Sequence, residues 1–479
     1  MANHKKALPS GNQYGNIDAS PVKSFFVEML TRDIELKYAV LDLLDNCVDG
    51  IQRSVPKLKK NKPYQGYYAN INFDRNKFSI DDNCGGIPWR LHNYAFRMGR
   101  ANPNVEKGIK TVGVYGIGMK RAIFKIGREC VIRTQDVSHS YEVKISEQWT
   151  KNDDWMLPVK TTNRRKNDGT KIEITIIPEG IKEQFGGEVF PDDLKKAIST
   201  SYAFIIQKGF NIKVNGDEIN PKSTNLKFTK STKKKDVIAP FIYKASHKGV
   251  DVFLAVGFTS PLIGEDMVDQ ENYKSRYSAI DAGWTIICND RVVEYCGKTE
   301  LTGWGSAGVP LFHNQFNSIS GIVEFSSDDA RKLPTTTTKR GIEASSPLYL
   351  HIRDKMIEGM KIFTDYTNQW KGKKLLEQSK KEIDSVPTLS LDKIKMKSES
   401  IEMTKTRPRG SVGVSGTQFK PQLPKPPGQG TSVQTIDIHF KRKRKEVEHV
   451  ADYIYGKKDI PPNEVGEQCF EIILDKARG

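Results

Sequence analysis

The stretch LDLLDNCVDG, residues 41–50, decides the fold of the first part of the chain. Its leucines and valine recur at helical spacing and form one apolar face. The other face gathers Asp42, Asp45, Asn46 and Asp49. Helices usually spread carboxylates and pair them with Lys or Arg one turn away, but this stretch contains no basic residue. A collection of oxygen acceptors with no basic neighbour indicates a functional face.

Three glycine-containing motifs follow this helix in a fixed order. DDNCGGI (81–87) ends a predicted strand, GVYGIGMK (113–120) opens a predicted helix, and the pair GT (169–170) begins a later strand. Each motif alone is a weak indication of a nucleotide site, because short glycine motifs often occur by chance. Their order behind an Asp/Asn-rich helix is far more specific.

The four motifs together resemble the GHKL superfamily, which includes gyrase B, the large heat-shock chaperone, histidine kinases and MutL-type repair proteins. The resemblance covers about residues 20–180 and implies the Bergerat nucleotide fold, with ATP and Mg²⁺ as the bound groups. In layout the chain is most similar to MutL- and MORC-like ATPases. The resemblance therefore predicts a slow, Mg-dependent ATPase.

The family's helix carries an acid and, one turn later, an asparagine, here Asp42 and Asn46. The resemblance implies that Asn46 is a Mg²⁺ ligand and that Asp42 is the general base. The family usually has Glu at that base, so the shorter Asp42 predicts slow turnover. Asp49 falls at the second acidic position, within the nucleotide-side network, and Asp45 is expected to be a solvated helix residue. The metal is then the expected counter-ion of the acidic face.

The strand motif supplies the adenine contact that the resemblance implies. Asp82 matches the family's aspartate, whose carboxylate accepts a hydrogen bond from the adenine amino group and disfavours guanine. The family pattern continues Asn-Gly-x-Gly, whereas this chain has Asn83-Cys84-Gly85-Gly86; Cys84 displaces the first glycine and Gly86 stays in place. We expect Cys84 to be a packing residue and Thr170 to lie near the nucleotide.

The glycine loop is expected to bring backbone amides to the phosphates. Gly113, Gly116 and Gly118 permit close backbone approach, and a helix N-terminus follows them. Lys120, in the first turn of that helix, either neutralises phosphate charge or is a surface lysine. The segment from Gly99 to Val112 occupies the place of the family's ATP lid. Its polar residues include Asn102, Asn104 and Lys107.

In gyrase B, MutL and the MORC proteins a second domain supplies a lysine that reaches the γ-phosphate. NDRVVEY (289–295) resembles the family strand that reads Asn-Gly-Arg-hydrophobic, and LPTTTTKRGI (333–342) follows the next predicted strand. This places Lys339 at the position of that lysine, with Arg340 as the second choice. The alternative is an exposed loop before a helix.

The expected fold class is α+β, a Bergerat-type sandwich followed by a transducer-like α/β domain and a helical tail. YYANINFDRNKFSIDD alternates apolar and polar residues about Arg75-Asn76 and predicts a β-hairpin. The predicted segments are an N-terminal arm (1–20), the ATP-binding domain (21–180), the transducer-like domain (181–375), a disordered linker rich in Pro, Gly and Ser (385–436), and the helical tail (437–479).

The amino-acid composition limits the classes of partner and the cellular location that we expect for the protein. The chain has 479 residues, with 75 Lys+Arg against 58 Asp+Glu, a net charge of +17 that favours DNA or RNA as a partner. The basic tract KRKRK (441–445) is a nuclear signal, a nucleic-acid patch or a solvated helix face. No sequence long and apolar enough for a bilayer and no secretory signal are evident, and the six cysteines form no CxxC pair, so we expect a cytoplasmic protein with no membrane partner.

The sequence leaves several functions open. The favoured one is a homodimeric clamp that ATP closes on nucleic acid, in DNA repair, DNA organisation or defence against foreign DNA, with an effector protein supplying any further chemistry. The alternative is a chaperone-like conformational ATPase acting on protein partners. A third possibility is a scaffold protein that has this fold but does not use ATP, because Asp42 occupies the position where the family usually has Glu.

Overall fold

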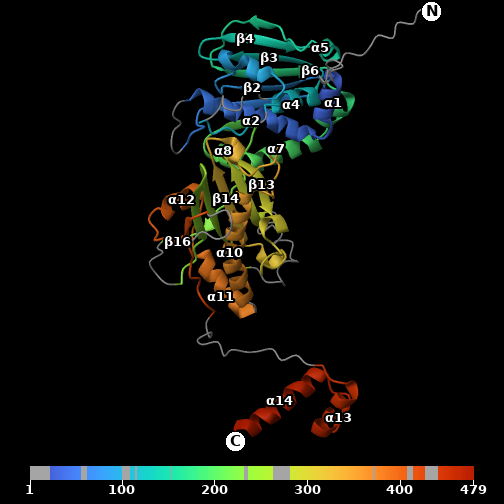
Figure 1. Ribbon diagram of the computed structural model, residues 1–479, viewed down its shortest axis with the longest axis vertical. Helices are drawn as coiled ribbons and strands as arrows, with labels where there is room; N and C mark the ends of the chain where they lie inside the picture. Colours follow the sequence, from blue (N-terminus) through green and yellow to red (C-terminus); the bar gives the residue numbers. More distant parts are fainter. Residues whose placement is uncertain are drawn as a thin grey trace, which may run out of the picture. The chain divides into compact units, whose positions relative to one another are not determined.

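The computed structural model describes residues 22–55, 62–99, 108–113, 116–152, 154–230, 236–262, 281–370, 373–406, 414–426 and 441–478. The chain forms two compact units, residues 1–424 and 425–479 (Figure 1). The two units are described separately below.

The first sheet of the larger unit has eight strands and is antiparallel except for one parallel pair, β1 with β7. In spatial order its strands are β5 (Val159–Thr161), β4 (Ser140–Ile145), β3 (Glu129–Gln135), β6 (Gly169–Thr175), β2 (Phe78–Asp82), β1 (Tyr68–Phe73), β7 (Asn211–Val214) and β8 (Asp217–Glu218). The predicted hairpin is confirmed, since β1 pairs with β2 in a register that joins Phe73 to Phe78.

Helix α2 (Leu36–Ser54) is the central helix against this sheet. Val40, Leu44, Val48 and Ile51 recur on one face and are fully buried in the core that the sheet shares. That packing turns the acidic face of α2 away from the sheet core. The other helices of this layer are α1 (Lys23–Arg32), α3 (His92–Phe96), α4 (Gly118–Ile126), α5 (Glu147–Lys151), α6 (Glu179–Gly186), α7 (Val189–Ser201) and α8 (Ala203–Gln207), with a 3₁₀ turn at Trp89–Leu91.

The second sheet has seven strands and is antiparallel except for the parallel pair of β12 and β14. In spatial order its strands are β13 (Arg291–Gly297), β12 (Gly283–Cys288), β14 (Ile319–Ser326), β11 (Val250–Phe258), β10 (Phe241–His247), β17 (Gly416–Phe419) and β16 (Thr404–Thr406). A separate two-stranded ribbon joins β9 (Leu226–Lys227) to β15 (Thr388–Leu389).

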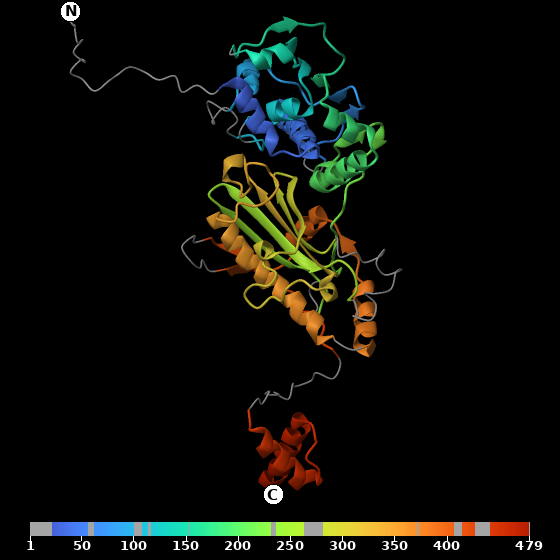
Figure 2. The same cartoon turned by 90° about the vertical axis from the view of Figure 1, so that its right-hand side faces the viewer.

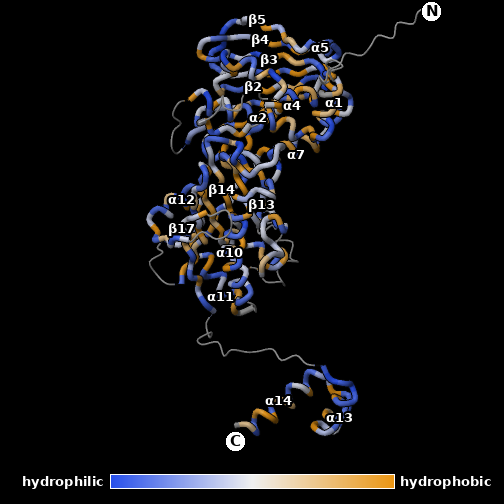
Figure 3. Tube along the Cα trace, in the orientation of Figure 1, coloured by the Kyte–Doolittle hydropathy of each residue, from blue (hydrophilic) through white to orange (hydrophobic). Residues whose placement is uncertain are grey.

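Both faces of the second sheet are covered. Tyr243 and Leu254 face a core completed by the long helix α10 (Pro347–Gln369), whereas Ile242 and Ala255 face a core completed by α8 and α12 (Leu391–Ser398) (Figure 2). Alternate residues of one strand thus enter different cores, as the period of two along a strand requires. Figure 3 shows hydrophobic colour gathered along these strands and beneath the helices. Helix α11 (Lys373–Asp384) follows α10.

Two of the predicted segment boundaries need correction. The first sheet extends past residue 180, because β7 pairs in parallel with β1 and the helices α6 and α7 contribute to the same core. The predicted disordered linker at 385–436 is wrong for 385–406 and 414–426. Those residues contain α12 and the strands β15, β16 and β17, and Leu391 and Ile394 are buried. The low apolar content misled the prediction because sheet edges need few apolar residues.

The smaller unit contains two helices, α13 (Arg444–Tyr455) and α14 (Pro462–Arg478), as predicted for the helical tail. They pack through Ala451 and Val465, which are buried. Residues 441–445, the basic tract, are exposed at the start of α13. Among the described helices of the whole chain, none combines the length and apolar character needed to cross a membrane.

Candidate functional site

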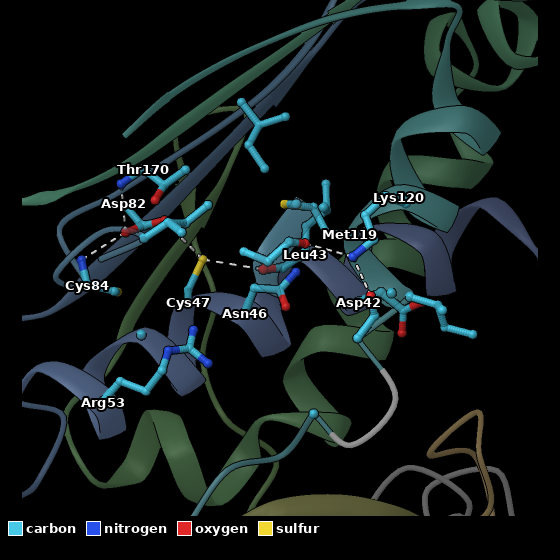
Figure 4. A pocket seen from close by; sticks show the side chains of 18 of the residues that line it. Asp42, Leu43, Asn46, Cys47, Arg53, Asp82, Cys84, Met119, Lys120 and Thr170 are labelled. Carbon is cyan, nitrogen blue, oxygen red and sulfur yellow. Dashed lines mark hydrogen bonds between the residues drawn. The ribbon is translucent and has the colours of Figure 1, made fainter. Parts of the chain in front are cut away.

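A cavity lies beside the acidic face of α2, next to the ends of β2 and β6 and the start of α4 (Figure 4). Ten of the eleven predicted site residues line it. They are Asp42, Asn46, Asp82, Gly86, Gly113, Gly116, Gly118, Lys120, Thr170 and Lys339. The eleventh, Asp49, holds the adjoining chain and does not line the cavity. The cavity measures about 120 Å³, less than the usual size of a small-molecule site.

One end of the cavity is formed around Asp82. Its Oδ1 accepts hydrogen bonds from the backbone amides of Cys84 (2.8 Å) and Thr170 (3.2 Å), and its Oδ2 accepts from the Cys47 thiol at 3.4 Å. Burial raises the pKa of Asp82 to about 6, although the two backbone amides and the thiol oppose that rise. The carboxylate is thus fixed in direction, and at neutral pH it is an ionised acceptor facing the cavity.

Glycines let β-strand backbones approach closely at this end. A Cβ on Gly86, whose φ is +69°, would lie 2.0 Å from the Gln135 carbonyl oxygen. A Cβ on Gly169 would lie 2.0 Å from the Asp82 carbonyl oxygen. Both are overlaps with backbone atoms that cannot move aside, so these two positions require glycine.

Cys84 is a packing residue, as expected, because its side chain is fully buried. Burial raises the pKa of its thiol to about 11. The thiol of Cys47 is also buried, and both its hydrogen bond with Cys84 and its burial raise its pKa. Neither thiol is a nucleophile at neutral pH.

Asp49 fixes the chain that follows the predicted lid. Its two carboxylate oxygens accept hydrogen bonds from the backbone amides of Val112 (2.6 Å) and Gly113 (2.9 Å). This carboxylate therefore anchors the glycine loop to α2 and does not contact the cavity itself. The predicted lid residues Asn102, Asn104 and Lys107 lie outside the described residues.

The glycine loop and α4 form the other end of the cavity. Gly116 has φ +70°, and Gly118 begins α4 beside α2, where a Cβ would lie in van der Waals contact with the Asp42 Cβ at 3.4 Å. Lys120 is buried rather than exposed, which excludes the surface-lysine alternative. Its ammonium donates to the carbonyl oxygens of Ala95 (2.7 Å) and Gly116.

Asp42 has a basic partner that sequence reasoning missed. Arg121 of α4 donates to Asp42 Oδ2 from Nε (3.1 Å) and Nη2 (2.5 Å), and both side chains are largely buried. The expectation that a metal is the counter-ion of the acidic face is therefore wrong for this carboxylate. Arg121 directly follows Lys120, but sequence alone does not indicate which of two adjacent basic residues faces α2.

Asn46, one turn after Asp42, lines the cavity with an amide whose buried Nδ2 has no hydrogen-bond partner among the described residues. A half-turn of the side-chain amide would present Oδ1 at the same place, the type of ligand that Mg²⁺ prefers. An unpartnered buried amide at this position fits a metal that takes its remaining ligands from phosphates and water. No cluster of three or more His, Cys, Asp or Glu side chains able to hold a metal is found among the described residues.

Asp45 was expected to be solvated, and this expectation is wrong. The side chain is 2% exposed and its two oxygens accept from Arg291 Nε (3.0 Å) and Lys339 Nζ (2.7 Å). The Tyr202 hydroxyl lies 2.6 Å from Asp45 Oδ1. Burial alone would raise the pKa of Asp45, but Lys339 and Arg291 outweigh it and lower that pKa to about 2.

This cluster joins four parts of the chain that are remote in sequence. Arg291 begins β13, its guanidinium stacks over the Tyr202 ring at 4.4 Å, and Tyr202 itself follows α7. Lys339 comes from the threonine-rich loop after β14, where it adopts a left-handed backbone with φ +57°. Such a conformation costs a lysine about 1 kcal/mol or more, so the loop is held by its tertiary contacts. Lys339 thus lies at the cavity, 294 positions from its partner Asp45.

Arg340, the second choice, lies beside the same face of α2 without lining the cavity. Its guanidinium group lies over the Tyr38 ring, 4.0 Å from the ring centre, and its buried Nη2 has no hydrogen-bond partner in the part of the chain that the structure describes. Burial lowers the pKa of Arg340, although the charge of Asp42 opposes that change.

The residues around this cavity belong to a segment that matches a known protein family. Residues 34–173 match the family described as histidine kinase-, DNA gyrase B-, and HSP90-like ATPase. The chain carries a GHKL ATPase domain. The matched range spans α2, Asp82, the glycine loop and Thr170, and a domain of this type binds ATP. No curated protein matches the chain.

Proposed function

We propose that this protein is a Mg-dependent ATPase whose second sheet domain senses the bound nucleotide, pairing two copies and closing them on nucleic acid. The observation that carries the proposal is the ion pair between Lys339 and Asp45. It brings a cation from the loop after β14 into the cavity of the GHKL ATPase domain. A chain that only binds nucleotide has no need of a strained loop lysine from a second domain at this place.

Each of the cavity side chains has a role at a different part of the nucleotide. Asp82 accepts from the adenine amino group, and the amides at the start of α4 bind the phosphates. Asn46 would hold Mg²⁺, which neutralises phosphate charge when bound. Asp42 orients and deprotonates the attacking water once Arg121 has turned from it toward phosphate. Lys339 leaves Asp45 for the γ-phosphate, a stronger anion.

The second domain is linked to the glycine loop as well as to α2. Asn289 Nδ2 donates to the Thr111 carbonyl oxygen at 2.9 Å, two residues before Gly113. Arg291, two positions after Asn289, binds Asp45. A shift of the phosphate-binding loop is therefore transmitted to the start of β13 through both residues, which supports coupling between nucleotide state and the second sheet.

Dimerisation is supported by an exposed apolar surface on and near α1. Phe25 and Met29 are more than half exposed, one helical turn apart, and Met156 is 76% exposed. Lys23 ties this region together, since its ammonium donates to the Trp149 carbonyl oxygen and lies over the rings of Trp149 and Trp155. Exposed apolar side chains grouped in this way are typical of a surface that another protein covers.

The nucleic-acid part of the proposal is supported by the net charge of +17 and the exposed basic tract 441–445. Phosphate contacts release counter-ions, so affinity for DNA must fall steeply as salt rises. If hydrolysis is stimulated by an unfolded polypeptide and not by DNA, the chaperone-like alternative replaces the clamp.

The test compares Lys339→Ala with Lys332→Ala, an exposed lysine in the same segment that does not line the cavity. Steady-state ATP hydrolysis is measured with and without double-stranded DNA, and mass is measured by light scattering with a non-hydrolysable ATP analogue. We expect the wild type and the Lys332 variant to dimerise with the analogue and to hydrolyse ATP. Lys339→Ala should bind ADP normally, stay monomeric and lose roughly a hundredfold in turnover.

Normal turnover and dimerisation in the Lys339 variant would contradict the sensing role. A wild-type protein that binds ATP but hydrolyses none, in any form, would contradict the enzymatic part.

A further inference from the structure

A second cavity, of about 450 Å³, lies away from the nucleotide site, between the first and second sheets of the larger unit. Its walls come from the end of α2, the start of the segment 108–113, the end of α8, the strands β10, β11 and β14, and α12. None of its lining residues belongs to the nucleotide cavity. Its volume lies within the range of small-molecule sites.

Four lysines from four different elements line this cavity: Lys110, Lys208, Lys244 and Lys395. Two of them have carboxylate partners, since Lys208 binds Asp290 and Lys395 binds Glu324. Asp290 also accepts from the Tyr64 hydroxyl at 2.8 Å, so its oxygens are occupied.

The other two lysines are not neutralised by carboxylates. Lys110 donates to the neutral Ser326 hydroxyl at 3.0 Å, and the Lys244 ammonium lies 6.0 Å from the centre of the Phe253 ring. Neither has an ion pair among the contacts of the described residues. Burial, with the positive charges of Lys208 and Lys110, lowers the pKa of Lys395 to about 8. The lining thus carries four lysines against three carboxylates, Asp251, Asp290 and Glu324, which leaves an excess of one positive charge.

We propose that this cavity binds a small molecule bearing two or more phosphate groups. Lysine ammonium groups from separate elements suit the several charged oxygens of such a ligand. Tyr64 and Phe253, the aromatic residues of the lining, are buried and offer no exposed ring on which a nucleic-acid base could stack. Gln52 and Ser326 add neutral hydrogen-bonding groups for the rest of the ligand.

Occupation of this site bears on the nucleotide site through the segment 110–113. Lys110 contributes to the second cavity, Thr111 is bound by Asn289, and Val112 and Gly113 are bound by Asp49. A phosphate group that draws Lys110 inward therefore acts on the glycine loop, which begins three residues later at Gly113. The binding proposal itself does not depend on ATP hydrolysis.

The experiment is calorimetric titration of inorganic tripolyphosphate into the full-length protein, with and without saturating ADP, at about 150 mM salt to screen weak surface contacts. The variants are Lys110→Gln/Lys244→Gln together, and as a control Lys248→Gln, an exposed lysine in the β10–β11 turn outside the cavity. We expect binding to ADP-loaded wild type, weakened at least about tenfold by the double variant and unchanged in the control.

A third variant distinguishes loss of the binding site from misfolding of the double variant. Asp251 is an exposed carboxylate of the lining, so Asp251→Asn should tighten tripolyphosphate binding by about threefold, a gain that an unfolded protein cannot give. The proposal is overturned if ADP abolishes all tripolyphosphate binding, or if the double variant binds as the wild type does. Displacement of tripolyphosphate by single-stranded DNA in the wild type, but not in the double variant, would assign these lysines to nucleic acid instead.

Discussion

The two ends of the nucleotide cavity differ in how far they are prepared for their ligand. At the end that we assign to adenine, called the adenine end below, backbone amides hold Asp82 in place, and Gly86 and Gly169 fix the strands around it. At the phosphate end, the charged groups are satisfied by one another: Arg121 binds Asp42, and Lys339 binds Asp45. One end thus presents a fixed hydrogen-bond acceptor to the cavity, whereas the charged groups at the other end form ion pairs with one another.

This difference separates recognition from chemistry. Under the roles proposed above, adenine binds without breaking any contact, whereas hydrolysis requires Arg121 and Lys339 to change partners. The volume of about 120 Å³ agrees, because a nucleotide with its phosphates needs more space than the closed cavity offers. Gain of phosphate contacts must offset the loss of these buried ion pairs, which makes opening of the phosphate end a step that ATP itself drives.

The sharpest way to separate the two ends is Asp42→Asn. We expect kcat for ATP hydrolysis to fall by about 10² to 10⁴, because the amide cannot take a proton from water, while ADP affinity changes less than about twofold. A coupled hydrolysis assay and calorimetry measure the two quantities. Asp33→Asn, at an exposed position just after α1, is the control and should leave both unchanged. Undiminished turnover in the Asp42 variant would remove this residue from the chemistry.

The complementary change is Asp82→Asn at the adenine end. Its amide group would face the adenine amino group with a donor, costing about 1–3 kcal/mol of binding, and the preference for ADP over GDP should shrink or reverse. Competition binding with a fluorescent nucleotide measures both affinities. The neighbouring Asp81 provides a matched control, since its carboxylate binds Arg165 at 2.7 Å and does not line the cavity. Unchanged ADP affinity in Asp82→Asn would mean that adenine is recognised elsewhere.

Much of the adenine end could be predicted from sequence, because its parts are local. A strand that ends in Asp82, a glycine at 86 and a Gly-Thr pair at 169–170 each leave a mark in the sequence, and their order identifies the fold. Despite the departure at Cys84, Gly85 and Gly86 both take positive φ and form the turn, and Cys84 is buried.

The phosphate end could be predicted only in part, because its partners are distant. Lys339 was found through the resemblance, but its partner Asp45 was expected to be solvated, and Arg291 lies 246 positions from that carboxylate. Helical spacing gives the face of α2 on which Asp45 lies, yet it cannot show that a second domain covers that face. Strands β15 and β17 were missed for the same reason, because their partners β9 and β10 lie more than a hundred residues earlier in the chain.

The smallest effect that we predict at the nucleotide cavity concerns pH at the adenine end. Burial raises the pKa of Asp82 from 3.8 to about 6, so the acceptor is ionised at pH 8 and largely protonated at pH 5. A protonated carboxyl is a weaker acceptor, and ADP affinity should therefore fall by up to about tenfold between pH 7 and pH 5. Calorimetry on wild type and Asp82→Asn measures this fall in affinity, and the ratio of their Kd values cancels the titration of the ADP phosphates.

The free energy of unfolding should respond to pH in the opposite sense to ADP affinity. Above pH 6 the buried Asp82 is ionised, and its burial lowers the free energy of unfolding. This destabilisation disappears as pH falls from 6 toward 3.8. A loss of ADP affinity at pH 5 is therefore not caused by unfolding that begins at Asp82. A ratio that stays constant from pH 8 to pH 5 would show that Asp82 does not titrate in this range, and the prepared acceptor would then owe its direction to the backbone amides alone.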